Sequence, residues 1–285
     1  MHLVWSCAGE DYRLMTHEMR LTSALDGLVD LKDESVDLVI TDPPYDTLEK
    51  WRDMGTTTRL KKSTMSSNEW FPTVDFEYLR KTFEECYRVL RKGSDCYVMC
   101  DEETGDALKP ILRDIGFDMR KSLIWHKVGK VEKVNCPNCG AHVTDRHTLG
   151  TPGMGYPYRS VYEMILLARK GKRPIPEDKS VRNVLEIPWI KRSSAYPTQK
   201  PVELCEVLIS QSSLKGDLVL DPFAGSGSCG EAAFNLGRKF LGFDVEQKAL
   251  DYFHERKQGW LYKPGEEPED APQISGGILD FLDQL

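Results

Sequence analysis

A short apolar run that stops at two consecutive prolines places the first constraint on the fold. Residues 36–40 (VDLVI) are rich in β-branched side chains, a composition typical of a buried parallel strand. Thr41-Asp42-Pro43-Pro44-Tyr45 follows at once, and neither proline can donate a hydrogen bond to a neighbouring strand. The strand must end there, with Asp42 and Tyr45 just past its carboxyl end. In open α/β sheets, ligands bind at that end of the strands.

Apolar segments of two different periods alternate along the rest of the chain. Helical spacing recurs at 76–90, with Asp75 as its cap and Gly93 as its stop, and at 103–115, with an interruption or kink near Pro110. Further helices are expected at Val202–Ser212 and 246–257, and strands at 95–100, 119–126, 160–168, Leu218–Asp221 and 240–243. This alternation predicts an α/β protein with a doubly wound, mostly parallel sheet that helices cover on both faces.

The turn after the first strand carries the groups that a flat amine substrate needs. The Asp42 carboxylate and a fixed backbone carbonyl can accept the two N–H bonds of an exocyclic amine. The Tyr45 ring can stack on the face of a base. An ordinary strand-to-loop turn with a surface tyrosine is the alternative for this motif alone, because Asp-Pro turns are common.

Two motifs taken together resemble those of a known enzyme family. DPPY at 42–45 is similar to the catalytic motif of amino-methyltransferases, which transfer a methyl group from S-adenosylmethionine to N6 of adenine or N4 of cytosine. Phe223-Ala224-Gly225-Ser226-Gly227 resembles their FxGxG cofactor motif, and its place after DPPY is similar to the order of the permuted β-group of DNA amino-methyltransferases. The resemblance implies a Rossmann-like methyltransferase fold, an adenine target for the Asp form of the motif, and catalytic roles for Asp42, Pro43, Pro44 and Tyr45.

The glycine-rich segment after Leu218–Asp221 is the expected cofactor site. Missing side chains let its backbone turn sharply and approach a ligand. The segment also fits G-x-G-x-x-G followed by an acid at Asp244, so a nicotinamide cofactor is a competing interpretation. The Asp-Pro-Phe before the glycines and the distant DPPY favour S-adenosylmethionine, and a plain β–α turn is the structural alternative. The resemblance implies cofactor contacts from Asp221, Phe223, Ala224, Gly225, Ser226 and Gly227, with Asp244 bonding the ribose hydroxyls.

A second segment resembles the cofactor side of the same family. Residues 196–201 (YPTQKP) are similar to the family's HPTQKP, with Tyr196 in place of the histidine. The resemblance implies that Thr198 and Lys200 contact the cofactor. A simple helix start is the alternative, because Pro201 suits the first turn of a helix.

Residues 128–160 break the sheet pattern and are expected to form a small recognition insert. Cys136-Pro137-Asn138-Cys139-Gly140 resembles half of a structural zinc site, because the Pro and Gly shape a tight turn that lets two thiolates reach one metal ion. A complete site needs four ligands, and His142 and His147 are the nearest candidates for the remaining two. A surface turn with two free thiols is the alternative.

Charge is distributed unevenly along the chain. The net charge is −7, but the tail 261–285 holds one lysine and six acids, so the remainder is close to neutral. Basic side chains in the long polar segment 46–72 and near the insert can contact phosphates, although solvated surface charge is the alternative. The expected DNA-binding residues are Arg59, Lys61, Lys62, Lys130 and Lys133.

These features predict a site-specific DNA methyltransferase that modifies N6 of a flipped-out adenine in double-stranded DNA. Cytosine-N4 transfer, methylation of RNA or protein, and a catalytically silent DNA-binding protein are the alternatives. The expected organisation is a catalytic half (1–127), the insert (128–160), a cofactor half (161–260) and an acidic tail (261–285). No apolar run reaches the roughly 18 residues of a membrane span, and a cytoplasmic location is expected. A homodimer is implied by the resemblance alone.

Overall fold

A nine-stranded sheet forms the centre of the computed structural model, which describes residues 17–44, 73–129, 132–135, 142–145, 158, 160–172, 179–190 and 199–261. Its strands are β1 (His17–Leu21), β2 (Val36–Thr41), β3 (Leu90–Cys100), β4 (Asp118–Met119), β5 (Leu123–Val128), β8 (Tyr162–Arg169), β9 (Val184–Pro188), β10 (Leu218–Asp221) and β11 (Lys239–Asp244). The order across the sheet is β1-β11-β10-β2-β3-β8-β5-β9, and β4 pairs with β8 beside this path.

Most neighbouring strands of this sheet are parallel, as predicted. β1, β11, β10, β2 and β3 follow one another in parallel, and β5 and β9 are parallel to each other. β8 runs antiparallel to its partners β3, β4 and β5. This reversed strand brings the start of β8 to the edge where the other strands end.

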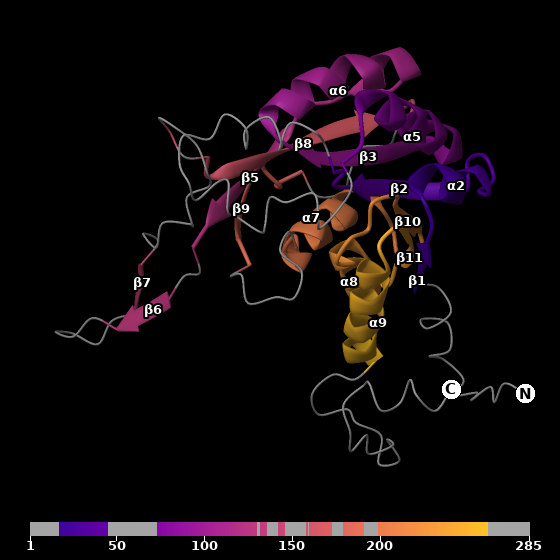
Figure 1. Cartoon of the computed structure of the whole chain (residues 1–285). Helices are drawn as coiled ribbons and strands as arrows, with labels where there is room; N and C mark the ends of the chain where they lie inside the picture. The colour runs from indigo at the N-terminus through magenta and orange to yellow at the C-terminus, as the bar shows by residue number, and fades with distance from the viewer. Residues whose placement is uncertain are drawn as a thin grey trace, which may run out of the picture.

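Helices cover both faces of the sheet (Figure 1). One layer holds α2 (Ala24–Val29), α5 (Phe76–Val89) and α6 (Glu102–Ile115), and the other holds α7 (Val202–Ser212), α8 (Ser228–Asn235) and α9 (Gln247–Leu261). Side chains of β2 alternate between the two cores, with Leu38 in the core of α7 and Val39 in the core of α5. The predicted doubly wound α/β fold is confirmed. Among the described helices, none combines the length and apolar composition needed to cross a membrane.

The helix α5 begins where the sequence predicts and ends earlier. Asp75 caps it, because its carboxylate accepts a hydrogen bond from the backbone N–H of Tyr78 at 2.8 Å. The expected stop at Gly93 is wrong. Leu90 is already extended and lies opposite Val36 of β2, so pairing with the sheet ends the helix at Val89.

Other boundaries also differ from the sequence expectations. The segment 119–126 forms two strands rather than one, and both β4 and β5 pair with β8. The helix α6 continues through Pro110 to Ile115 without interruption. β1, α2 and β9 lie in stretches where no element was expected. In β9 the structure buries Leu185 and Ile187 and exposes their neighbours more, which is the alternation of a strand with one face in the core.

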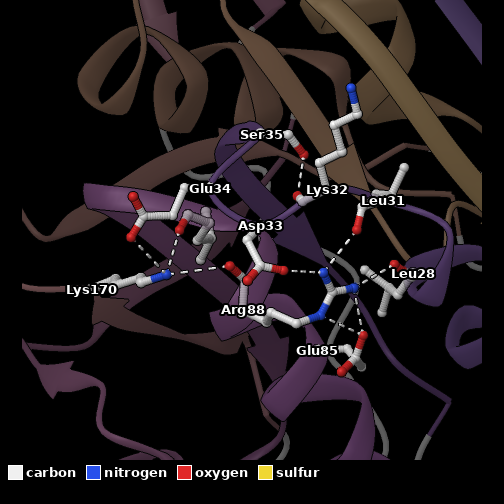
Figure 2. Close-up of polar contacts among 10 residues, drawn as sticks. Leu28, Leu31, Lys32, Asp33, Glu34, Ser35, Glu85, Arg88 and Lys170 are labelled. Carbon is white, nitrogen blue, oxygen red and sulfur yellow. Dashed lines mark hydrogen bonds and ion pairs between the residues drawn. The ribbon is translucent and has the colours of Figure 1, made fainter.

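Arg88 of α5 ties the end of α2 and the following loop to the helix layer (Figure 2). Its guanidinium donates to the carbonyl of Leu28 at 2.9 Å and to the carbonyl of Leu31 at 2.8 Å. It also binds the carboxylates of Asp33 at 2.6 Å and Glu85 at 2.7 Å. These bonds satisfy carbonyls at the end of α2 and fix the approach to the amino end of β2.

A separate two-stranded sheet lies in the segment expected to be an insert. β6 (Glu132–Asn135) and β7 (His142–Asp145) are antiparallel, and Asn135 pairs with His142. Figure 1 shows this pair away from the central sheet. The structure describes the backbone of these two strands, and the segment 136–141 between them lies outside the described residues.

Candidate active site

Three carboxylates meet at one edge of the sheet because the strands before them are parallel neighbours. Asp42 follows β2, Asp221 ends β10 and Asp244 ends β11. β10 pairs with β2 on one side and with β11 on the other. This arrangement brings the start of the DPPY motif beside the glycine loop, at the edge where open α/β sheets bind ligands.

The proline corner after β2 is anchored on both sides. Thr41, the last residue of β2, is buried. The carbonyl of Pro44 accepts a hydrogen bond from the backbone N–H of Val74 at 2.9 Å, so the chain is back at the corner after residues 45–72. The Asp42 side chain is 30% exposed to solvent, so a ligand can reach its carboxylate.

Asp42 belongs to a network of charged side chains from four parts of the fold. The Lys200 ammonium contacts Asp42 Oδ2 and lies 3.3 Å from Glu163 Oε2. The Lys127 ammonium lies 2.5 Å from Glu163 Oε1. Two carboxylates and two ammonium groups therefore balance each other in charge at this edge.

This network sets the ionisation of both carboxylates. Burial raises the pKa of Asp42 above its ordinary value, and the Lys200 ammonium offsets only part of that effect. Burial also acts on Glu163, but the ammonium groups of Lys200 and Lys127 outweigh it and hold the pKa of Glu163 below its ordinary value. The same surroundings therefore shift the pKa values of the two carboxylates in opposite directions.

Glu163 and Lys127 are site residues that the sequence analysis did not predict. Met164 of β8 lies opposite Cys100 at the end of β3, so the reversed strand starts where its neighbour stops. Glu163 in turn pairs with Trp125 of β5, and Lys127 lies two residues further along that strand. The signal available in the sequence was a single acid near the start of an otherwise apolar strand.

Two residues with positive φ shape the loop between β10 and α8. Gly225 has φ 49° and Gly227 has φ 72°. A Cβ atom at Gly227 would lie 2.5 Å from Phe253 Cδ2, so both the conformation and the space require glycine. The backbone N–H of Ala224 donates to the carbonyl of Phe243 at 2.9 Å and docks the loop against β11.

The two acids beside this loop hold its backbone in place. Asp221 accepts a hydrogen bond from the N–H of Phe223 at 3.1 Å, and Asp244 accepts bonds from the N–H groups of Gly225 and Glu246, each at 2.9 Å. Burial raises the pKa of Asp221 to about 7 and raises the pKa of Asp244 above its ordinary value. An ionised carboxylate has about four acceptor positions, so the partly exposed Asp244 can still bind a ligand, whereas Asp221 is buried and acts on the loop itself.

The edge thus combines a corner suited to an amine with a loop suited to a cofactor. Ser228, at the start of α8, donates its hydroxyl to the carbonyl of Lys200 at 2.7 Å and joins the loop to the lysine segment. The glycine backbone admits a ligand closely, and the acid at the end of β11 suits hydroxyl donors. These properties fit S-adenosylmethionine, which carries ribose hydroxyls.

The described residues hold part of the predicted site, and the assigned roles stay predictions. Those brought to this edge are Asp42, Pro43, Pro44, Lys200, Asp221, Phe223, Ala224, Gly225, Ser226, Gly227 and Asp244. Those outside the described residues are Tyr45, Arg59, Lys61, Lys62, Lys130, Cys136, Cys139, His147 and Thr198. Lys133 lies in β6 and His142 in β7, each as backbone alone. Within the described ranges, no group of three or more His, Cys, Asp or Glu residues could hold a metal ion.

Comparison with protein families and sequences agrees with this geometry. A family model described as DNA methylase matches residues 36–255. The chain is 29% identical over 257 residues to the type II methyltransferase M.HpaI of Haemophilus parainfluenzae, across 85% of this chain and 74% of that protein. It is 26% identical over 242 residues to the DNA adenine methyltransferase YhdJ of Escherichia coli (strain K12), across 79% of this chain and 78% of that protein.

Solved structures share the fold. TTHA0409 of Thermus thermophilus, a candidate DNA modification methylase complexed with S-adenosyl-L-methionine, has a TM-score of 0.58 at 23% identity and covers 87% of this chain and 95% of its own. The PvuII DNA methyltransferase, which is cytosine-N4-specific, has a TM-score of 0.61 at 15% identity, over 89% of this chain and 88% of its own. At these identities the likeness shows the fold and leaves the target base open.

Proposed function

The chain belongs to the DNA methylase family, and we propose that it transfers a methyl group from S-adenosylmethionine to the N6 amine of adenine in DNA. The observation that carries this proposal is the corner of Asp42 and Pro43, held beside the glycine loop at the carboxyl edge of the sheet. The Asp form of the motif and the similarity to the adenine methyltransferase YhdJ favour adenine over cytosine.

Asp42 and the carbonyl of Pro43 accept the two N–H bonds of the target amine. These bonds localise the nitrogen lone pair, which is otherwise delocalised into the ring, and so make the nitrogen a better nucleophile. S-adenosylmethionine supplies a methyl group that its sulfonium activates. Tyr45 is expected to stack on the base. The residues act through positioning and electrostatics, and no covalent bond to the protein is required.

The backbone of Gly225 and Gly227 is the proposed support for the cofactor. Asp244 bonds the ribose hydroxyls, and Asp221 shapes the start of the loop through its bond to Phe223. Ala224 and Ser226 contribute their backbone positions beside the glycines. Thr198 stays a predicted cofactor contact from the family resemblance.

Double-stranded DNA is the proposed substrate. A base inside a duplex cannot reach the sheet edge, so the target base must leave the stack. The basic residues near the β6–β7 pair and in the segment 46–72 are the proposed phosphate contacts, namely Lys130, Lys133, Arg59, Lys61 and Lys62. Membership of the permuted β-group, a homodimer and a zinc ion at Cys136 and Cys139 stay predictions.

Methyl transfer from labelled S-adenosylmethionine to unmethylated duplex DNA tests the proposal. After digestion and separation of the nucleosides, we expect the label in N6-methyladenine. Label in N4-methylcytosine would identify cytosine as the target instead. RNA and protein substrates run in parallel, and label in those alone would overturn the assignment to DNA.

Asp42→Asn tests the role of the corner, because it keeps the shape of the side chain and removes its charge. We expect transfer to fall by about 100-fold or more, the size expected when a stabilising polar group of an active site is lost. Calorimetric titration with S-adenosylmethionine should show unchanged affinity. Asp251→Asn, on the exposed side of α9, is the matched control and should keep full activity. Full turnover in Asp42→Asn would contradict the proposed mechanism.

A further inference from the structure

We propose that Lys200, held in place by Glu163, is a positioning residue that keeps the Asp42 carboxylate ionised and oriented for the target amine. This inference rests on the methyl transfer proposed above, at the same sheet edge. The inference gives Lys200 a role toward the substrate in place of the predicted contact with the cofactor. It also gives a role to Glu163, which belongs to none of the motifs.

The Lys200 ammonium lies between carboxylates from two different strands. It contacts Oδ2 of Asp42, just after β2, and lies 3.3 Å from Oε2 of Glu163, near the start of β8. The Lys200 side chain is 16% exposed, so it is enclosed beside its partners rather than extended into solvent. An ionised acceptor makes a shorter and stronger hydrogen bond than a neutral one, so Asp42 binds an amine more strongly when it is ionised.

Three members of this network, namely Lys200, Glu163 and Lys127, are each held by a second contact. The backbone carbonyl of Lys200 accepts the hydroxyl of Ser228 at 2.7 Å, next to the glycine loop. Glu163 is bound on its other oxygen by Lys127, whose ammonium lies 4.9 Å from the centre of the Trp125 ring. Trp125 is itself buried in the sheet. These contacts fix the position of the Lys200 ammonium before the substrate binds.

The charges that act on Asp42 oppose one another. Burial raises the pKa of Asp42, the neighbouring Glu163 carboxylate raises it further, and Lys200 and Lys127 lower it. Asp42 also faces the buried Asp221 carboxyl across the strand pair of β2 and β10. Without Lys200, Asp42 would be a partly buried acid near other acids and would stay protonated over a wider range of pH.

A second carboxylate matters when the target amine arrives. The amine needs one oxygen atom of Asp42, and Lys200 contacts one of the two. Glu163 offers the Lys200 ammonium another partner at 3.3 Å. When the amine binds Asp42, the ammonium can therefore keep an opposite charge beside it, which a partly buried charge needs. Glu163 is therefore expected to ease the entry of the amine.

The pH profile of turnover tests the role of Lys200. In Lys200→Gln, the acid limb of the pH profile of kcat should move to higher pH by about one unit. This is the size expected when an adjacent opposite charge is lost. The affinity for S-adenosylmethionine should not change. Lys200→Arg keeps the charge and should restore the limb. Lys81→Gln, which removes an exposed lysine paired with Glu77, controls for net charge and should leave the limb in place.

Two outcomes would overturn this role. If the acid limb of the pH profile of kcat does not move in Lys200→Gln, then Lys200 does not control the ionisation of Asp42. An unmoved limb combined with weaker binding of S-adenosylmethionine returns Lys200 to the predicted cofactor contacts.

Glu163→Gln tests the second carboxylate and should act in a different direction. Of the two carboxylates described at the Lys200 ammonium, only Asp42 then keeps its charge, so Lys200 should bind Asp42 more tightly and the KM for DNA should rise. The acid limb should stay or move to lower pH, because Glu163 no longer raises the pKa of Asp42. An unchanged KM for DNA would remove Glu163 from the proposal.

A direct titration separates this inference from the proposed function. The carbon-13 carboxyl signal of Asp42, assigned by its absence in Asp42→Asn, should titrate at higher pH in Lys200→Gln than in the unaltered protein. This measurement needs no turnover. Identical titration in both proteins, with DNA methylated normally, overturns the inference alone. A shifted titration in a protein that methylates no DNA supports the network and contradicts the proposed function.

Discussion

Gly227 adopts a conformation that an L side chain reaches only at a cost. Its φ is 72°, and an added Cβ would lie 2.5 Å from Phe253, which is fully buried. Gly227→Ala should lower the free energy of unfolding by about 1–2 kcal/mol through the backbone alone, and by more because Phe253 must move. Denaturant unfolding measures this loss, and calorimetric titration should show weaker binding of S-adenosylmethionine.

Gly259→Ala is the matched control for that substitution. Gly259 lies on the exposed side of α9, and nothing comes within 4 Å of an added Cβ. Alanine favours a helix over glycine, so this variant should gain up to about 1 kcal/mol. If Gly227→Ala were as stable as Gly259→Ala, the loop would not have the strained conformation described.

Asp221 makes stability depend on pH near neutrality. Burial raises its pKa from about 3.8 to about 7. A carboxyl with a raised pKa favours the folded state while it is protonated, so its contribution is complete below the unfolded pKa and is lost as the pH rises through about 7. Asp221→Asn is neutral at every pH and should remove this loss.

Denaturant midpoints at several pH values from about 5 to 8 check this expectation. The midpoint of the unaltered protein should fall more steeply than that of Asp221→Asn from about pH 5 to about pH 7, and the two curves should become parallel above that range. Curves that stay parallel over the whole range would mean that Asp221 titrates far from neutrality. Asp251→Asn, on the surface of α9, should leave the curve of the unaltered protein unchanged.

At the scale of elements, Arg88 and Lys170 secure the connection from α2 to β2. The Lys170 ammonium, just after β8, donates to the carbonyl of Leu90 at 2.7 Å and lies 3.6 Å from the Glu34 carboxylate (Figure 2). Glu34 has φ 52°, an uncommon value for a residue other than glycine. The two cations therefore hold a tight loop at the amino end of the strand whose other end precedes Asp42.

Arg88→Met should destabilise the protein by about 2 kcal/mol, because bonds from a charged donor to the carbonyls of Leu28 in α2 and of Leu31 after it are lost. Arg80→Met is the matched control on the same helix. Arg80 contacts Asp114 at 3.3 Å near the surface, and its loss should cost less than about 1 kcal/mol. Denaturant unfolding of the two variants compares these losses. Similar stability in both would show that the cluster in Figure 2 does not secure the loop.

At the scale of the whole molecule, cofactor binding should stabilise all three layers together. The glycine loop contacts β11, α8 is joined to the lysine segment before α7, and β10 lies in the middle of the sheet. A ligand that binds the folded state alone stabilises it by about 2.7 kcal/mol at 100 times its Kd. Thermal unfolding with increasing S-adenosylmethionine should show a rising Tm, with a smaller rise in Gly227→Ala. A Tm independent of the cofactor would contradict the proposed site.

The sequence by itself determined the features that depend on local order. The β-branched run before two prolines sets the end of β2, Asp75 sets the start of α5, and the glycines after Asp221 set the turn into α8. The spacing of apolar residues, with one period for strands and another for helices, was enough to predict the class of the fold. Each strand and each helix must bury an apolar face, and that need sets the spacing. The residues of DPPY and the glycine loop could be predicted for the same reason, since each motif is contiguous.

Tertiary structure alone decided where distant charges meet. Lys200 and Asp42 are 158 residues apart, and Glu163 reaches the same ammonium because β8 runs in reverse beside β3. The pairing of Leu90 with Val36 of β2 ended α5 at Val89 instead of near Gly93, against the local pattern. Strand direction and register are set by which apolar faces pack together across the whole sheet, and no short segment carries that information. Glu163 therefore becomes a site residue only in the folded molecule.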